Sequence, residues 1–394
     1  MNNKILFLIL DGAADVGAKT PLSEARKPNL DMLAQHSLCG MFEPIMPPGY
    51  NIASFSDITT LQLLGCFDYS KYTGRGYFEA LGVGIKTRPG SVYLRANFST
   101  VDKKWNIIDR RAGRADEGLD DLTEAINNIG KIDDVRVRLH KSAGHRAVLV
   151  LEGLGLSSKV TDSDTGEITG IKEIKPTDKT REARTTADIL NKFMKKAYEV
   201  LSSHPANQKR KIPANFLLLR GAGEYIKVPS FKEKFGLSAC VVTGVGIIKG
   251  IARFLDITVI EVPGATGHFN TNLEGKISAV SNALDDYDFV ILHLNGADES
   301  GHDKNFELKK KFIEKADEIV FSNVIKHRNI NIAVAIDHTT SSKTGKHETG
   351  PVPFLIYDGE ESNNIEKFDE VHCNQGFHTA NPMERVMLSL ARKK

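Results

Sequence analysis

The sequence lacks several features that mark particular classes of protein. Its four cysteines (Cys39, Cys66, Cys240 and Cys373) lie far apart and form no CxxC pair, so no disulfide framework is indicated. No apolar run approaches the ~20 residues that a membrane-spanning helix requires. The formal net charge is only +2 over 394 residues. Since the balance is neither strongly basic nor strongly acidic, nucleic acid and membrane surfaces are not indicated as partners.

Repeats, low-complexity segments and a targeting segment are also missing. The apolar run at the N-terminus spans only residues 5–10, ends at Asp11-Gly12 and has no small-residue cleavage site. It therefore fits a first β-strand better than a signal peptide. We expect a soluble, cytoplasmic protein that has no nucleic-acid or membrane partner. Self-association into a homo-oligomer stays open.

The chain does contain alternating strand and helix patterns, which are typical of an α/β protein. Short apolar runs that are typical of buried parallel strands occur at 5–10, 240–242, 257–262, 289–294 and 332–336, with helical patterns between them. From about 87 to 222 the pattern changes to shorter strands with turns, followed by a helix over 180–203. The fold predicted is a doubly wound, mostly parallel sheet in residues 1–86 and 223–394, with an inserted mixed α/β cap over 87–222.

Side chains that can bind metals stand at the ends of these runs. The apolar stretch 332–336 stops on Asp337-His338, and Asp11 follows the first strand. Asp298 and His302 follow the strand at 289–294 with a spacing that places both on one helical face. Each feature alone is as well explained by a helix cap or by chance. Because ligands gather beyond the carboxyl ends of parallel strands, the joint pattern, together with His347 and Ser56, favours a two-metal site.

Ligands of this type indicate the class of metal and of chemistry. Asp and His without Cys favour Mn²⁺, Mg²⁺, Co²⁺ or Zn²⁺, and two such ions can clamp a phosphoryl group. Ser56 falls at the start of a predicted amphipathic helix, where a hydroxyl beside a divalent cation can act as a nucleophile. An ordinary helix cap is the alternative for Ser56, and Ser54 is its close rival as the nucleophile.

Longer motifs carry a resemblance that runs nearly end to end. They are LILDG (8–12), SD (56–57), LLG (63–65), YTGRG (72–76), DRRAGR (109–114), GHRAVLVL (144–151), LLRGAG (218–223), VPGATG (262–267), EGK (274–276), DESGHD (298–303), DH (337–338) and GPVP (350–353). In these the sequence resembles the archaeal-type cofactor-independent phosphoglycerate mutases, within the alkaline phosphatase superfamily.

The resemblance implies an alkaline-phosphatase-like fold and the interconversion of 3-phosphoglycerate and 2-phosphoglycerate, in glycolysis and gluconeogenesis, through a phosphoserine on Ser56. It implies two divalent ions, with Mn²⁺ as the first choice. One would be held by Asp298, His302 and His347, and the other by Asp11, Asp337 and His338 beside Ser56. Three segments depart from the family pattern, namely Phe55 in place of glycine, Cys66-Phe67-Asp68 and Gly345-Lys346. These departures concern the geometry of the loops and not the class of reaction, since every metal ligand that the resemblance implies is present.

Phosphoglycerates are small trianions, so their pocket needs several cations. We expect the substrate-binding cations to be Arg110, Arg114, His145, Arg146 and Lys276, with Arg75, Arg111 and Arg220 as further candidates. For the three arginines of 109–114 the alternative is a solvated charge run, but Asp109 and a glycine make that segment a tight turn. Lys276 is the candidate for stabilising the leaving oxygen.

Two other functions remain open at this point. A metal-dependent phosphatase or phosphodiesterase of the same superfamily would keep the metal ligands but release phosphate to water. A non-catalytic, metal-binding regulatory protein would result if Phe55 misplaced the serine. The cap arginines favour the mutase over the first alternative, and the complete ligand set argues against the second.

Overall fold

The computed structural model describes residues 4–46, 55–164, 166, 168, 170–327 and 329–391. The chain divides into two compact units, one of residues 1–70 and 228–394 and the other of residues 71–227. The second unit thus begins before the expected boundary at residue 87. The reason is α4 (Arg75–Gly82), which packs against the sheet of that unit, with the ring of buried Tyr77 against Tyr93.

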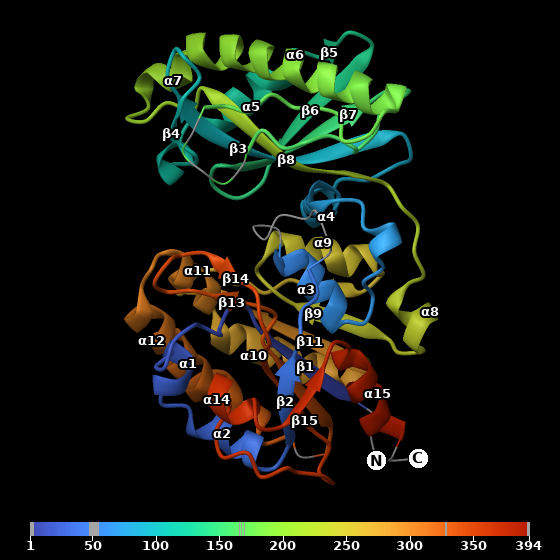
Figure 1. Ribbon diagram of the computed structural model, residues 1–394, viewed down its shortest axis with the longest axis vertical. Helices are drawn as coiled ribbons and strands as arrows, with labels where there is room; N and C mark the ends of the chain where they lie inside the picture. Colours follow the sequence, from blue (N-terminus) through green and yellow to red (C-terminus); the bar gives the residue numbers. More distant parts are fainter. Residues whose placement is uncertain are drawn as a thin grey trace. The chain divides into compact units, whose positions relative to one another are not determined.

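The first unit is built on one large sheet (Figure 1). In sheet order its strands are β10 (Thr258–Ile260), β9 (Ala239–Val242), β11 (Phe289–Leu294), β1 (Ile5–Leu10), β12 (Asn331–Ala335), β15 (Val352–Tyr357), β2 (Leu38–Phe42) and β16 (Phe377–Thr379). Only β15 runs against the others. The expectation of a mostly parallel sheet is therefore confirmed. A separate hairpin pairs β13 (Thr339–Thr340) with β14 (His347–Glu348).

Helices cover both faces of this sheet (Figure 1). They are α1 (Pro21–Glu24), α2 (Pro28–Gln35), α3 (Phe55–Leu63), α8 (Phe231–Phe235), α9 (Gly246–Phe254), α10 (Leu273–Asp286), α11 (Gly296–His302), α12 (Phe306–Ala316), α13 (Ser322–Val324), α14 (Glu370–Cys373) and α15 (Pro382–Ala391). Helices α2 and α10 pack on one side against a π-helical turn that follows α12, whereas α3 packs with α9 and α15. The central strands are buried on both faces, which explains their uninterrupted apolar sequences.

The second unit is an antiparallel sheet with helices along it. Its strands are β3 (Ser91–Val101), β4 (Ile107–Asp109), β5 (Lys131–Ile132), β6 (Val135–Lys141), β7 (Arg146–Glu152) and β8 (Phe216–Glu224), and its further helices are α5 (Leu119–Asn127), α6 (Arg181–Ser203) and α7 (Pro205–Lys209). Figure 1 shows the long α6 running along one face of this sheet.

Strand β3 has two different faces, and both are buried. Val92, Leu94 and Phe98 belong to the apolar core shared with α5 and α6. Arg95 and Asn97 alternate with them and therefore point to the opposite face. The second unit consequently holds buried charge on one side of its sheet and an apolar core on the other.

Two local features differ from what the sequence pattern predicts. The helical periodicity of 306–323 predicts one continuous helix, but the segment is interrupted by the π-helical turn Asp317–Phe321, where buried Asp317 accepts backbone N–H groups of Asn29 and Leu30 at the start of α2. The polar, basic composition of 202–212 predicts a surface loop, but this stretch contains α7 and buried Arg210. Arg210 donates to the carbonyl oxygens of Ala112 and Ala115 and so holds the turn after β4.

None of the helices in the described part of the chain combines the length and hydropathy that a bilayer span requires.

Candidate functional site

The candidate site lies where the central strands of the first unit end. Asp11 follows β1, and Asp337 comes two residues after β12. Gly12, the residue after Asp11, has φ +60°. A Cβ at this position would lie 2.6 Å from Thr340 Oγ1 and 2.7 Å from Asp298 Oδ1. A side chain at position 12 is therefore excluded by both backbone conformation and space, which lets the segments approach closely.

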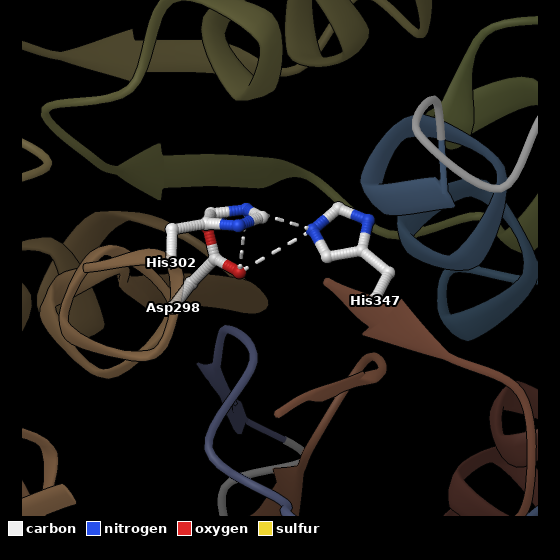
Figure 2. Close-up of side chains that lie close together, drawn as sticks. All are labelled: Asp298, His302 and His347. Carbon is white, nitrogen blue, oxygen red and sulfur yellow. Dashed lines mark hydrogen bonds and ion pairs between the residues drawn. The ribbon is translucent and has the colours of Figure 1, made fainter. Parts of the chain in front are cut away.

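One group of candidate ligands consists of Asp298, His302 and His347 (Figure 2). Asp298 Oδ1 lies 3.5 Å from Nε2 of each histidine, and the two Nε2 atoms are 3.0 Å apart. Donors bound to one tetrahedral ion at about 2.0–2.1 Å stand roughly 3.3 Å from one another. The three atoms therefore have the spacing of a single metal site.

The tautomer of His302 fits this reading. Its Nδ1 lies 2.8 Å from the carbonyl oxygen of Gly345 and donates to it, because a carbonyl can only accept. The lone pair of the neutral ring is then on Nε2, toward the other two ligand atoms. Metal-binding histidines are commonly held in this way through their second nitrogen.

The second group consists of Asp11, Asp337 and His338, all buried, with ligand atoms within 4.8 Å of one another. Ser56, the second residue of α3, has its Oγ 3.1 Å from His338 Nε2. The rings of His338 and His347 have centroids 4.2 Å apart. The two groups are thus neighbours, and the serine lies at the second one.

The pKa values of several of these buried groups are strongly shifted. Burial raises the pKa of Asp337 to about 7, and the nearby charge of Asp298 adds to this. Burial lowers the pKa of His338 to about 4. Burial also opposes ionisation of Asp298, but a hydrogen bond from His347 and the charges of the neighbouring histidines hold its pKa well below the usual range. The imidazole of His338 is therefore neutral at pH 7, the form that binds a metal.

The polar atoms present fit divalent cations. Asp337 Oδ1 accepts the N–H groups of Gly12 and His338, whereas its buried Oδ2 has no hydrogen-bond partner among the described residues. Buried carboxylate oxygens without partners are costly, and a cation at this position would offset the cost. With carboxylate and imidazole donors in both groups, the site suits the ions expected from the sequence.

Phe55, the departure from the family pattern that casts doubt on the serine, is fully buried and stacks on His338. The two ring centroids are 5.7 Å apart and the planes are inclined by 13°. Ser56 nevertheless reaches His338. The larger residue therefore covers one face of a candidate ligand and leaves the adjacent hydroxyl at the ligand group.

Lys276 and His293 lie beside these groups. Lys276 is fully buried on α10 and donates to the carbonyl oxygens of His293 and Thr266 at 3.2 and 3.4 Å. Burial lowers its pKa to about 8. His293 Nε2 lies 3.1 Å from Asp11 Oδ2. His293 was not among the predicted site residues, although a histidine within the apolar strand FVILHL is an unusual feature.

In the second unit, three of the expected cations, Arg75, Arg110 and Arg220, lie at two largely buried carboxylates. Glu79 Oε1 accepts from Arg75 Nε and from Arg95 Nη1, each at 3.0 Å. Asp164 Oδ1 accepts from Arg110 Nη2 at 2.6 Å and Nε at 3.1 Å. Arg95, Glu79 and Asp164 were missed, because inside a strand, a helix or a loop nothing in the sequence marks them as partners of arginines.

Other expected cations surround His145. Burial lowers the pKa of this histidine to about 3, and the charges of Arg146, Arg95, Arg111 and Arg114 add to the effect. Arg111 and Arg114 are exposed on a 3₁₀ turn, and Arg146 is also exposed. Asp109 accepts the N–H groups of Arg111 and Gly113, which forms the tight turn that the sequence predicts. Arg220 Nε lies 3.9 Å from Asp164.

This concentration of positive charge points to an anionic ligand. The guanidinium groups outnumber the carboxylates that they contact, and burial opposes the charge of Arg95 and of Arg220, holding both pKa values below their usual range. A phosphate or carboxylate would relieve that repulsion. We call these residues, Arg75, Arg95, Arg110, Arg111, Arg114, His145, Arg146 and Arg220, the arginine cluster.

Comparisons with known proteins agree with this chemistry. The family model for 2,3-bisphosphoglycerate-independent phosphoglycerate mutase matches residues 34–207. A curated protein of Archaeoglobus fulgidus with that name is 42% identical over 387 residues, which cover 94% of this chain and 93% of that protein. A namesake from Methanocaldococcus jannaschii is 40% identical, covering 95% of this chain and 93% of the other.

Two solved structures share the whole fold. A protein from Pyrococcus horikoshii is 31% identical with a TM-score of 0.82, covering 100% of this chain and 99% of that one. A cofactor-independent phosphoglycerate mutase from Thermoplasma acidophilum is 32% identical with a TM-score of 0.63, covering 98% and 100%. Identity of this degree over nearly the full length establishes that the chain belongs to the 2,3-bisphosphoglycerate-independent phosphoglycerate mutase family.

Proposed function

We propose that this protein interconverts 3-phosphoglycerate and 2-phosphoglycerate without bisphosphoglycerate, through a phosphoserine on Ser56. The observation that carries the proposal is the position of the Ser56 hydroxyl, 3.1 Å from His338 within two adjoining Asp/His groups. Membership of the family supports the same reaction. The first transfer forms the bond from Ser56 Oγ to phosphorus and breaks the bond from phosphorus to the C3 oxygen of the substrate. The second transfer returns the phosphoryl group to the C2 oxygen.

The first unit supplies the reacting groups. Two divalent ions, of which Mn²⁺ is our first choice, would favour the ionised serine and neutralise the phosphoryl oxygens when bound to the two ligand groups. Ser56 supplies the nucleophilic oxygen, and the start of α3 provides a favourable field for its negative charge. We assign Lys276 to the leaving oxygen, because a pKa of about 8 suits a group that stabilises an alkoxide and exchanges its proton near neutral pH.

The arginine cluster of the second unit supplies the anion-binding groups. Arginine forks match the geometry of carboxylate and phosphate oxygens. A mutase must keep glycerate bound after the first transfer, so the cluster has a second task besides binding the substrate. Glu79 and Asp164 fix the orientation of Arg75, Arg95 and Arg110, which reduces the entropy lost when the ligand binds.

The test is to incubate the purified protein with 3-phosphoglycerate and Mn²⁺ in the absence of bisphosphoglycerate. We expect 2-phosphoglycerate as the main product and a phosphorylated protein on rapid acid quenching. Ser56→Ala serves as the inactive control. Stoichiometric release of inorganic phosphate would replace the mutase with the phosphatase alternative. Absence of both products would favour the metal-binding regulatory protein.

A further inference from the structure

Lys309 is a buried lysine that the proposed reaction does not use. It lies on α12, is fully buried, and belongs to no motif singled out in the sequence. Its ammonium has three hydrogen-bonding partners, which are the carbonyl oxygen of Ala14 at 2.7 Å, that of Thr340 at 2.6 Å and Asp15 Oδ2 at 3.2 Å. An ammonium has three donors, so every donor of this group is used.

These partners belong to two segments that both carry candidate metal ligands. Ala14 and Asp15 follow Asp11 after β1, and Thr340 lies in β13, shortly after His338. The segments are also joined directly, since the Thr340 N–H donates to Ala14 and Asp15 Oδ2 accepts the N–H of Ser342. Lys309 therefore connects them from a third element, α12.

Thr340 links Lys309 to the Asp298, His302 and His347 group. Its Oγ1 donates to Asp298 Oδ1 at 2.6 Å. In the hairpin of β13 and β14, Thr340 is paired with His347. The neighbourhood leaves little room for adjustment, because a Cβ at Gly301 would lie 2.8 Å from Thr340 Cγ2. Thr340 thus contacts one ligand of the Asp298, His302 and His347 group through its side chain and is paired with another through its backbone.

We propose that Lys309 is a positioning residue for the metal centre, which acts through Thr340 to hold Asp298 and His347 at the spacing of one ion. The inference rests on the proposed two-metal site and assigns a new residue to it. Residues that orient metal ligands typically contribute 10- to 100-fold to metal affinity. The effect should be largest at the Asp298, His302 and His347 group, because Thr340 contacts Asp298 directly, whereas Asp337 of the other group is held by Gly12 and by its own loop.

The experiment is a calorimetric Mn²⁺ titration of the metal-free protein. We expect two binding steps for the unsubstituted protein, and His347→Ala identifies the step that belongs to the Asp298 group. Lys309→Met should weaken that step at least tenfold and weaken the other step by a clearly smaller factor. Lys311→Met is the matched control, because Lys311 lies exposed on the same helix; it should bind both ions like the unsubstituted protein.

A second pair of variants tests the route through Thr340. Thr340→Val removes the hydroxyl and should weaken the same step, whereas Thr340→Ser keeps the hydroxyl and should largely retain it. If Lys309 acts through Thr340, the double variant Lys309→Met with Thr340→Val weakens the step no more than the stronger single variant. Losses that multiply in the double variant would overturn the inference.

The remaining outcomes are also decisive. Lys309→Met with a lower melting temperature but unchanged Mn²⁺ binding would make Lys309 a purely structural residue. If Lys309→Met does not fold, Lys309→Arg keeps the charge but cannot aim a planar fork at three diverging acceptors, and it must show the same selective loss. An unsubstituted protein that binds no Mn²⁺ would overturn the proposed metal centre, whereas equal binding by both proteins would overturn this inference alone.

Discussion

At the scale of single residues, the proposed reaction depends on the hydroxyl of Ser56. Ser56→Ala keeps the fold, because alanine suits the first turn of α3, but removes the oxygen that accepts the phosphoryl group. We expect turnover to fall by at least 10³-fold and the phosphoprotein to disappear, as measured by a coupled 2-phosphoglycerate assay and by mass spectrometry of acid-quenched protein. Ser54→Ala, at a position outside the described residues, should retain both signals. The reverse pattern would identify Ser54 as the nucleophile.

Phe55 allows a second test at this scale. Phe55→Ala should lower the free energy of unfolding of the first unit by about 3 kcal/mol, the usual cost of removing a buried phenylalanine. It should also weaken Mn²⁺ binding, because His338 loses the ring that stacks on it. Phe55→Leu should recover most of the stability but less of the Mn²⁺ affinity. Urea unfolding and metal titration measure the two effects. Mn²⁺ binding that is unchanged in both variants would limit Phe55 to packing.

Individual residues also show how far the sequence alone could lead. Asp11 and Asp337 could be predicted as candidate ligands that lie close together, because each follows an apolar strand and the edge of a parallel sheet collects such residues. Arg95 and Glu79 could not, because one lies in a strand and the other in a helix. Their pairing exists only after α4 has packed on β3. Buried ion pairs of this kind depend on tertiary contacts that have no local signal.

At the scale of elements, α4 is held to its sheet by charge as well as by the packing of Tyr77 against Tyr93. Burial would raise the pKa of Glu79, but Arg95, Arg75 and Arg146 lower it from 4.5 to about 2. The unfolded chain therefore binds a proton more readily than the folded one. The resulting stabilisation, about 3 kcal/mol, is present above pH 4.5 and is lost as the pH falls through about 2.

Glu79→Gln tests this account. We expect the free energy of unfolding of the second unit to fall by about 3 kcal/mol at pH 7, with a smaller difference from the unsubstituted protein at pH 3. The fluorescence of Trp105, the only tryptophan of the chain and part of the second unit, reports this transition in urea. Glu124→Gln, at an exposed position of α5, should have little effect. A loss for Glu79→Gln that is independent of pH would exclude the ionised pair as its cause.

Most elements could be predicted from the sequence because their apolar periodicity is local. Strand β1 and the long α6 show this, each lying within a residue of its expected range. The reversed direction of β15 could not be predicted, since it depends on pairing with β12 and β2. The π-helical turn after α12 was missed for a similar reason. Asp317 bonds there to the start of α2, a segment nearly 290 residues earlier in the chain.

At the scale of the whole molecule, all candidate metal ligands belong to the first unit. Removal of metal with EDTA should therefore abolish activity while the protein stays folded, because the large apolar cores do not include the ligands. Saturating Mn²⁺ at about 100 times its Kd should stabilise the first unit by about 2.7 kcal/mol and leave the Trp105 transition in place. Circular dichroism follows the unfolding of the first unit, and fluorescence follows the Trp105 transition. Full activity in EDTA, or an equal shift of both transitions, would contradict this division.

The balance between mutase and phosphatase is a second property of the whole chain, since the proposed reaction assigns the serine to one unit and the arginine cluster to the other. Arg114→Ala should raise the fraction of free phosphate among the products, because glycerate held by fewer cations escapes before the second transfer. The two products are quantified from one reaction mixture. Lys131→Ala, an exposed cation elsewhere in the second unit, is the control. A phosphate fraction that Arg114→Ala does not change would remove Arg114 from glycerate retention.

The position of β1 in the centre of the sheet has a consequence for synthesis of the chain. Ile5 of this first strand pairs with Phe289 on one side and with Asn331 on the other, so both partners leave the ribosome long after it. The apolar strand ILFLIL therefore lacks its native partners β11 and β12 while the entire second unit is translated. Such exposed strands are prone to aggregate. We expect nascent chains that stop before residue 289 to require chaperones, and the ligand geometry to arise only after His347, the last of the candidate ligands, has emerged.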